Sequence, residues 1–173
     1  MYINIVSFIK INRILPCLIL ILVKCNYTYS KNIYFETNNI GAYITSKTIK
    51  MANGTSVIQF ENDMAWTDNF GNYGSAFCYG FFISTKKIYS KFDLYCEAKN
   101  QKGDYLWSYY TRPDTEYDAG SGEAIFIDGT GDYKKLVGTK CVFSTRYMDK
   151  KIFSKTKCKI SDEQHKILNN MSK

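Results

Sequence analysis

Histidine and proline are scarce in this chain, and their scarcity limits its chemistry. Of 173 residues, one is histidine and two are proline. His165 lies in a polar C-terminal segment, so a Ser-His-Asp triad inside a folded core is excluded. Four cysteines follow the N-terminal region, and no two of them are closer than 17 residues, which excludes the CxxC spacing of zinc sites. We expect no metal and no cofactor, and the sequence identifies no catalytic residue.

A long apolar run is also missing. The most apolar stretch is "ILPCLILILV", ten residues from Ile14 to Val23, preceded by Lys10 and Arg13 without any acid. A helix of ten residues rises about 15 Å, half of a bilayer core of about 30 Å. This layout is typical of a secretory signal peptide, which we place at residues 1–30. Cleavage after Ser30 is our first choice, and cleavage after Cys25 or an uncleaved anchor are the alternatives.

Export follows from that signal, and the mature protein is expected to be secreted or periplasmic and free of the membrane. The formal net charge of the whole chain is +7. Removal of the signal takes away three of its positive charges and leaves a mild excess. Because the remaining lysines form no dense block, we expect no nucleic-acid partner.

The cysteines of the mature chain indicate disulfide bonds. Cys17 and Cys25 belong to the signal, which leaves Cys78, Cys96, Cys141 and Cys158. An even number of cysteines in an oxidising compartment predicts two bridges.

The segment 31–160 has the pattern of a single all-β domain. Eight or nine short runs rich in β-branched and aromatic residues are separated by Asn, Gly, Asp and Lys, which favours a barrel or a sandwich. Only residues 161–173 have a helical or disordered pattern. The runs are "GAYITSKTI", "TSVIQFEN", "MAWTDNF", "GSAFCYGFFIST", "KFDLYCEAK", "YLWSYYTR", "GEAIFIDG", "GTKCVFSTRY" and "KIFSKTKCKI".

Hairpin geometry pairs the four cysteines. A two-residue turn at Asp149–Lys150 places Cys141 opposite Cys158, at a separation suitable for a bridge. A three-residue turn centred on Lys87 places Cys78 opposite Cys96. The sequence therefore predicts these two bridges.

Alternation along the strands then assigns the faces, because alternate residues share one side of a strand. If the cysteines point inward, the charged neighbours of Cys96 and Cys158 point to water. The strand of Cys78 is the exception, since it has an apolar outer face of Phe77, Tyr79, Phe81 and Ile83. An apolar outer face of this kind usually packs against another segment or another protein. We expect either the C-terminal tail or a second copy of the chain in a homo-oligomer.

The stretch "GTGDYKKLVG", residues 129–138, looks like a nucleotide-binding loop but lacks its features. Its glycines miss the GxGxxG spacing, a strand follows instead of a helix, and no Lys-Ser or Lys-Thr follows the last glycine. It is better interpreted as a structural corner built on Gly129, Gly131, Tyr133 and Gly138, in which Gly131 supplies a φ that other residues resist.

The longer segment "GEAIFIDGTGDYKKLVGTKCVF" resembles the strand, turn and strand of the allene oxide cyclase-like and dirigent-like barrel superfamily, in particular its small exported bacterial members. That resemblance implies an eight-stranded antiparallel barrel, with a short helical or disordered C-terminal tail here, whose interior can hold a small hydrophobic ligand. The expected walls of that interior are Phe82, Leu94, Leu106, Tyr110 and Phe143. Small residues at Ala76, Gly80, Ala98 and Ser108 are candidates for leaving space.

Two functions fit these features. A non-catalytic exported barrel would bind a small hydrophobic or aromatic ligand, or associate with itself. The alternative is a cyclase or isomerase acting on a small hydrophobic substrate in the cavity, as the resemblance suggests. We favour the first, because the only acid beside an apolar run is Glu123 and strand ends usually expose such residues.

Overall fold

The structure is a computed structural model, which describes residues 32–85, 88–113, 115–116 and 119–171. The expected signal peptide, with its cleavage sites, lies outside the described residues. The expected β domain and C-terminal tail lie within them, apart from the short gaps and the last two residues.

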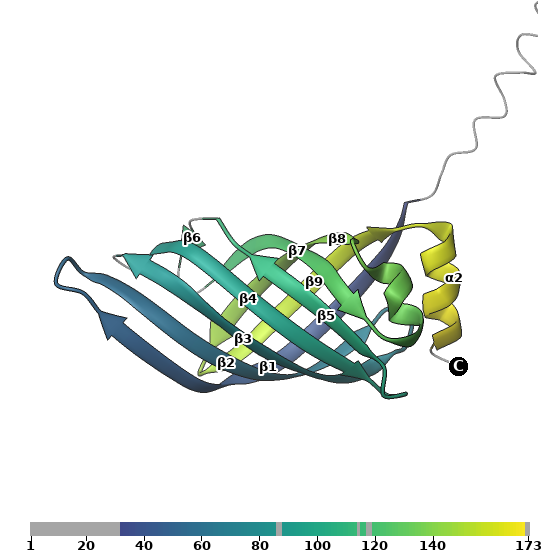
Figure 1. Cartoon of the computed structure of the whole chain (residues 1–173), viewed down its shortest axis with the longest axis horizontal. Helices are drawn as coiled ribbons and strands as arrows, with labels where there is room; N and C mark the ends of the chain where they lie inside the picture. Colours follow the sequence, from purple (N-terminus) through teal and green to yellow (C-terminus); the bar gives the residue numbers. More distant parts are fainter. Residues whose placement is uncertain (1–31, 86–87, 114, 117–118, 172–173) are drawn as a thin grey trace, which may run out of the picture. The chain divides into compact units, whose positions relative to one another are not determined.

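Eight long antiparallel strands form a closed barrel (Figure 1), which confirms the predicted fold. Each long strand pairs with the next, β1 also pairs with β9, and the pairing of β3 with β4 completes the ring. The two-residue strand β6, Thr115–Glu116, pairs only with the start of β4. The long strands are β1 (Ile33–Lys50), β2 (Thr55–Asp68), β3 (Tyr73–Thr85), β4 (Ile88–Asn100), β5 (Tyr105–Thr111), β7 (Ala119–Gly129), β8 (Lys140–Met148) and β9 (Lys151–Ile160).

The first two strands are longer than the sequence pattern indicates. Strand β1 begins at Ile33 rather than near Gly41, because its first residues pair with the last residues of β9, including Phe35 with Cys158. Strand β2 joins two runs that the sequence separates. Its buried positions, Phe60, Asn62, Met64 and Trp66, keep one phase across the polar letters "END".

The predicted Cys141–Cys158 hairpin is confirmed. Met148 pairs with Lys151, and the two turn residues Asp149 and Lys150 have positive φ values of 49° and 64°. Positive φ at both central residues defines a type I′ turn, whose twist matches that of paired strands. The cysteines lie directly opposite each other and are bridged.

The Cys78–Cys96 bridge is also confirmed, but the three-residue turn behind that prediction is wrong. Thr85 pairs with Ile88, so two residues separate the strands, and both lie outside the described part of the chain. The register shifts by one between the pair Ser84–Tyr89 and the pair Ile83–Lys91. An extra residue within β4 therefore keeps the cysteines opposite, as a β-bulge does.

One end of the barrel is closed by two helical segments. The 3-10 helix η2, Gly131–Leu136, and the C-terminal helix α2, Asp162–Met171, lie together at this end (Figure 1). Leu136 and Leu168 are fully buried between them and the strands. The tail is thus helical rather than disordered.

A reciprocal cap starts α2. The backbone N–H of Gln164 donates to Ser161 Oγ at 3.2 Å, and the backbone N–H of Ser161 donates to Gln164 Oε1 at 3.0 Å. This is the capping box expected from a Ser followed three residues later by Gln. Gln164 Nε2 also donates to Lys135 O at 3.1 Å, which ties the helix to η2.

The glycine stretch forms the predicted corner. Gly131 has φ +51° and Gly138 has φ +84°, a region that residues with a side chain rarely adopt. Tyr133, 1 % exposed, lies under the barrel, and a Cβ on Gly129 would lie 2.7 Å from its carbonyl carbon. The backbone of Gly129 therefore packs directly against the backbone of Tyr133. Strand β8 follows residues 129–138, so no helix N-terminus after the turn is available to bind a phosphate.

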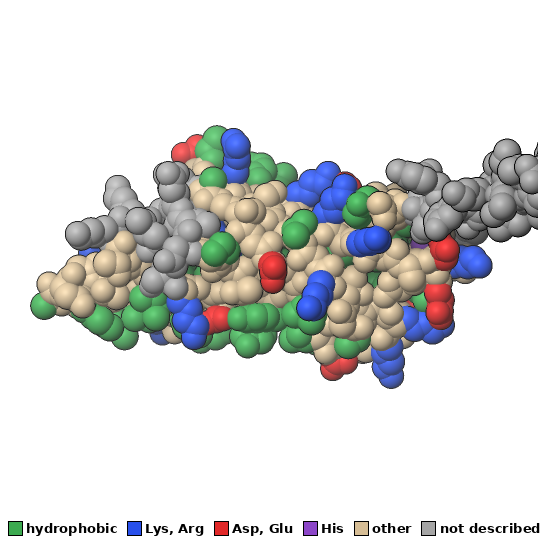
Figure 2. Space-filling view, turned by 90° about the horizontal axis from the view of Figure 1, so that it is seen from above, with side chains coloured by type: hydrophobic (Ala, Val, Ile, Leu, Met, Phe, Trp, Pro, Cys, Tyr) green, Lys and Arg blue, Asp and Glu red, His purple; other side chains and the backbone are tan. Residues whose placement is uncertain are grey.

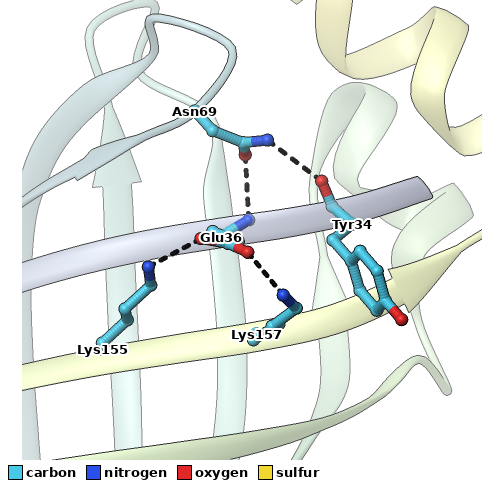
Figure 3. Close-up of polar contacts among 5 residues, drawn as sticks. All are labelled: Tyr34, Glu36, Asn69, Lys155 and Lys157. Atoms are coloured by element: carbon cyan, nitrogen blue, oxygen red, sulfur yellow. Dashed lines mark hydrogen bonds and ion pairs between the residues drawn. The ribbon is translucent and has the colours of Figure 1, made fainter. Parts of the chain in front are cut away.

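An ion-pair cluster joins β1 to β9 on the outside of the barrel (Figure 3). Glu36 accepts from Lys155 Nζ at 2.7 Å and Lys157 Nζ at 2.9 Å. Lys157 Nζ also lies 4.1 Å from the centre of the Tyr34 ring. The two lysines lower the pKa of Glu36 from its ordinary value of 4.5.

The two bridges are expected in the purified mature protein. Non-reducing peptide mapping should join Cys78 to Cys96 and Cys141 to Cys158. Replacing either pair by serine should lower the free energy of unfolding by about 2–4 kcal/mol in a denaturant titration. Free thiols throughout, or a Cys96–Cys141 peptide, would contradict this pairing.

Gly131→Val should destabilise the barrel by about 1–3 kcal/mol, because a β-branched residue resists positive φ. Its Cβ would also lie 2.5 Å from Asp104 Oδ1. Gly54→Val is the control, since Gly54 has φ +84° but open space around the added Cβ. Chemical denaturation should rank Gly131→Val as the less stable. Equal stability of both variants with the wild type would show that the corner is not structural.

Glu36→Gln should lower the melting temperature at pH 7 and have little effect at about pH 2.5. A lowered native pKa stabilises the fold above the ordinary carboxyl value, and that contribution is lost as the pH falls through the native value. The deficit should shrink in about 1 M salt, because the cluster lies at the surface. Glu123→Gln, at an exposed carboxylate on β7, is the control. A deficit that persists at low pH would assign the effect to something other than charge.

Candidate functional site

A cavity of about 80 Å³ lies inside the barrel. It runs along the interior between the inward-facing residues of all eight long strands, next to Tyr133 of η2. Its lining residues include Thr37, Asn39, Phe60, Asn62, Trp66, Ala76, Phe92, Leu94, Ala98, Leu106, Ser108, Tyr110, Phe126, Tyr133, Phe143, Thr145, Tyr147 and Ser154.

Aromatic rings form much of the cavity wall. Phe92 lies 5.9 Å from Phe60 and 6.5 Å from Phe143, measured between ring centroids. Tyr110 meets Phe143 edge-on at 5.1 Å. Such ring pairs stabilise each other beyond the area that they bury, so the wall is a connected aromatic cluster.

Amide and hydroxyl groups interrupt this aromatic wall. Asn39 Nδ2 donates to Thr37 Oγ1 at 3.3 Å and to Ser154 O at 3.4 Å. Asn62 is only 4 % exposed, and its Oδ1 atom has no hydrogen-bond partner. A buried carbonyl oxygen without a donor costs about 1–3 kcal/mol, so native structures rarely keep one without a reason.

The cavity is electrically neutral. Of the described residues that line it, none is Asp, Glu, Lys, Arg or His. Burial raises the pKa of the Tyr133 phenol well above its ordinary value, so this hydroxyl keeps its proton at any physiological pH. Glu123, the acid that the sequence offers, is exposed on β7 and does not line the cavity.

Four of the five expected wall residues line the cavity: Leu94, Leu106, Tyr110 and Phe143. Phe82 is buried but lies outside the lining and packs on Phe60 at 5.3 Å. Among the small residues, Ala76, Ala98 and Ser108 line the cavity. Gly80 does not, because the backbone of β4 lies against it and leaves no space for a Cβ.

The sequence analysis missed the polar residues of β1 and β2. Asn62 has the same inward phase as Phe60, Met64 and Trp66, and Asn39 the same phase as Phe35. The sequence does contain an indication of these residues, because each is an Asn at a position that alternation assigns to the inward, apolar side of its strand. It was overlooked because "TSVIQFEN" and "MAWTDNF" were treated as two separate runs, which placed Asn62 at the end of a strand rather than within one.

The outer face of β3 is apolar, as predicted. Phe77 is 44 % exposed, Tyr79 47 % and Phe81 37 %, while Ile83 is half-buried. The expectation that the C-terminal tail covers this face is wrong, because α2 packs on η2 and the start of β1 instead. Figure 2 shows exposed hydrophobic side chains along one edge of the barrel.

Two open hollows lie on the outer wall. One of about 360 Å³ is lined by residues of β3, β4, β5 and β7. The other, of about 800 Å³, is lined by residues of β1, β2, β7, β8 and β9, which include the exposed Ile40, Phe153, Arg146 and Lys155 and the buried Trp66 and Thr145. Among the residues that the structure describes, neither hollow is lined by a buried polar atom without a partner, whereas the interior cavity is lined by Asn62.

Comparisons with protein-family models, with curated proteins and with solved structures find no match to this chain. Among the residues that the structure describes, no helix is both long enough and apolar enough to span a lipid bilayer. The two bridges fit an oxidising compartment.

Proposed function

We propose that the protein is a non-catalytic binding barrel, whose interior holds a small, neutral, aromatic molecule with one hydrogen-bond donor. The unpartnered Oδ1 of Asn62 carries this proposal, because it lies in the cavity among aromatic rings. A hydroxyl or amine on the ligand would supply the missing donor. An exported protein is proposed from the disulfides together with the N-terminal signal pattern.

The size of the cavity limits the ligand. At 80 Å³, the cavity has about half the volume of an apolar protein cavity of about 150 Å³ that binds benzene. Pockets for drug-sized ligands are larger, at about 300–1,000 Å³. A single six-membered ring with one polar substituent, as in phenol, is therefore the upper limit for the size of the ligand, and it matches the polarity of the lining.

We also propose that the chain belongs with the allene oxide cyclase-like and dirigent-like barrels. The closed eight-stranded barrel and the positive φ of Gly131 and Gly138 support this assignment. A cyclase or isomerase activity is the weaker alternative, since general acid-base catalysis needs a group that titrates near the working pH. The described lining has neutral amides, hydroxyls and phenols instead.

Phenol should raise the melting temperature in a saturable manner, because a ligand that binds only the native state stabilises it. Anisole, which has the same ring and no donor, should bind at least about tenfold more weakly, the value of one hydrogen bond. Asn62→Leu should abolish this preference for phenol over anisole. It should also keep or raise the melting temperature of the free protein, because it removes an unsatisfied polar atom.

Asn38→Leu is the matched control, since Asn38 is exposed on β1 and does not line the cavity. It should leave the preference for phenol unchanged. Equal stabilisation by phenol and anisole in the wild type, or no stabilisation by either, would contradict the proposal.

A further inference from the structure

A row of alternating aromatic and acidic side chains crosses four strands on the outer wall. Phe77 of β3 lies opposite Glu97 of β4, Glu97 opposite Trp107 of β5, and Trp107 opposite Asp128 of β7. All four belong to the outward phase of their strands, and they line the hollow of about 360 Å³ with Tyr95 and Ile127. We call this hollow the aromatic groove.

The rings of the aromatic groove are held in place and accessible. Trp107 Nε1 donates to Glu97 Oε2 at 2.9 Å, and its ring stacks on Tyr105 at 5.5 Å with an angle of 14° between the planes. Tyr95 is 55 % exposed and Phe77 44 %. The groove thus presents ring faces that need no rearrangement before a ligand binds.

Charge at the aromatic groove is negative. Glu97 and Asp128 are both exposed and line it, and its lining includes no Lys or Arg among the described residues. Asp93, also on β4, is not part of the groove and accepts from Tyr109 Oη and from Lys91 Nζ. A cation in the groove is attracted both by the two carboxylates and by the negative faces of the aromatic rings.

The same wall already holds ammonium groups on its rings. Lys91 Nζ lies 5.4 Å from the centre of the Phe81 ring, and Lys99 Nζ lies 5.5 Å from the centre of the Tyr105 ring. These lysines flank the groove and leave its central rings to a ligand. A primary ammonium is strongly hydrated, whereas a methylated ammonium gives up less water to reach a ring face.

We infer that the aromatic groove is a binding site for a small organic cation with a quaternary ammonium group. The rings of Phe77, Tyr95 and Trp107 contact the methyl groups, and Glu97 and Asp128 neutralise the charge. This site is separate from the interior cavity, which has no charged lining, so either site can be present without the other.

The test follows the two indole N–H signals in a ¹H–¹⁵N spectrum, because the chain has two tryptophans. Choline should shift the Trp107 signal in a saturable manner, with a dissociation constant in about the millimolar range expected of exposed contacts. Trp66, buried and bonded to Ser75 O, is the internal control and should not shift. The neutral carbon isostere of choline, 3,3-dimethylbutan-1-ol, should bind at least about threefold more weakly.

Charge variants separate the groove from the rest of the surface. Glu97→Gln with Asp128→Asn should weaken choline binding at least about threefold while the Trp66 signal stays in place. Glu123→Gln, an exposed carboxylate on the same strand as Asp128, should leave binding unchanged.

Three results would overturn the inference. The first is equal binding of choline and its neutral isostere, which would make the groove merely apolar. The second is a Trp107 shift with a neutral sugar and none with choline. The third is a dimer, seen by sedimentation, that buries Trp107 and that choline does not displace.

Discussion

Each strand of the barrel has to satisfy two surfaces at once, because alternate side chains point to the interior and to solvent. This period of two fixes where every other feature lies. It turns the four cysteines inward, Lys155, Lys157 and Lys159 outward, and Asn62 into the cavity. A shift of one residue would exchange the two faces, so the register is strongly specified. The bridges lock that register in both hairpins, since each joins residues directly opposite each other.

Closure of one end and of the seam completes the barrel. At one end, η2 and α2 bury Tyr133, Leu136 and Leu168, and Gln164 connects the two segments. Along the seam, β1 pairs with β9 and the Glu36 cluster joins the same strands from outside (Figure 3). The Oδ1 atom of Asn62 can stay without a hydrogen-bond partner, because the aromatic residues around it stabilise the barrel interior without its help.

Local patterns were sufficient to predict most of the strands, both bridges and the corner at Gly131 and Gly138, but not the start of β1, the continuity of β2 or the turn between β3 and β4. Each of the features predicted correctly depends on residues close in sequence: a turn type, an alternation or a positive φ. The position of α2 was not predictable, because it depends on contacts between Gln164 and η2, which are distant in the chain. The cavity was predicted in its apolar part alone. Whether Asn62 finds a donor depends on side chains from other strands, and no strand pattern specifies those contacts.

The central claim is that the cavity recognises a ring through one hydrogen bond to Asn62. The most direct measurement is a crystal structure of the mature protein soaked with phenol. We predict electron density for the ring in the cavity, beside Phe60 and Phe92, with its hydroxyl about 2.7–3.0 Å from Asn62 Oδ1. The soak uses phenol at a concentration that saturates the thermal shift. A cavity that then contains no phenol, with ordered water bonded to Asn62, would contradict this binding mode.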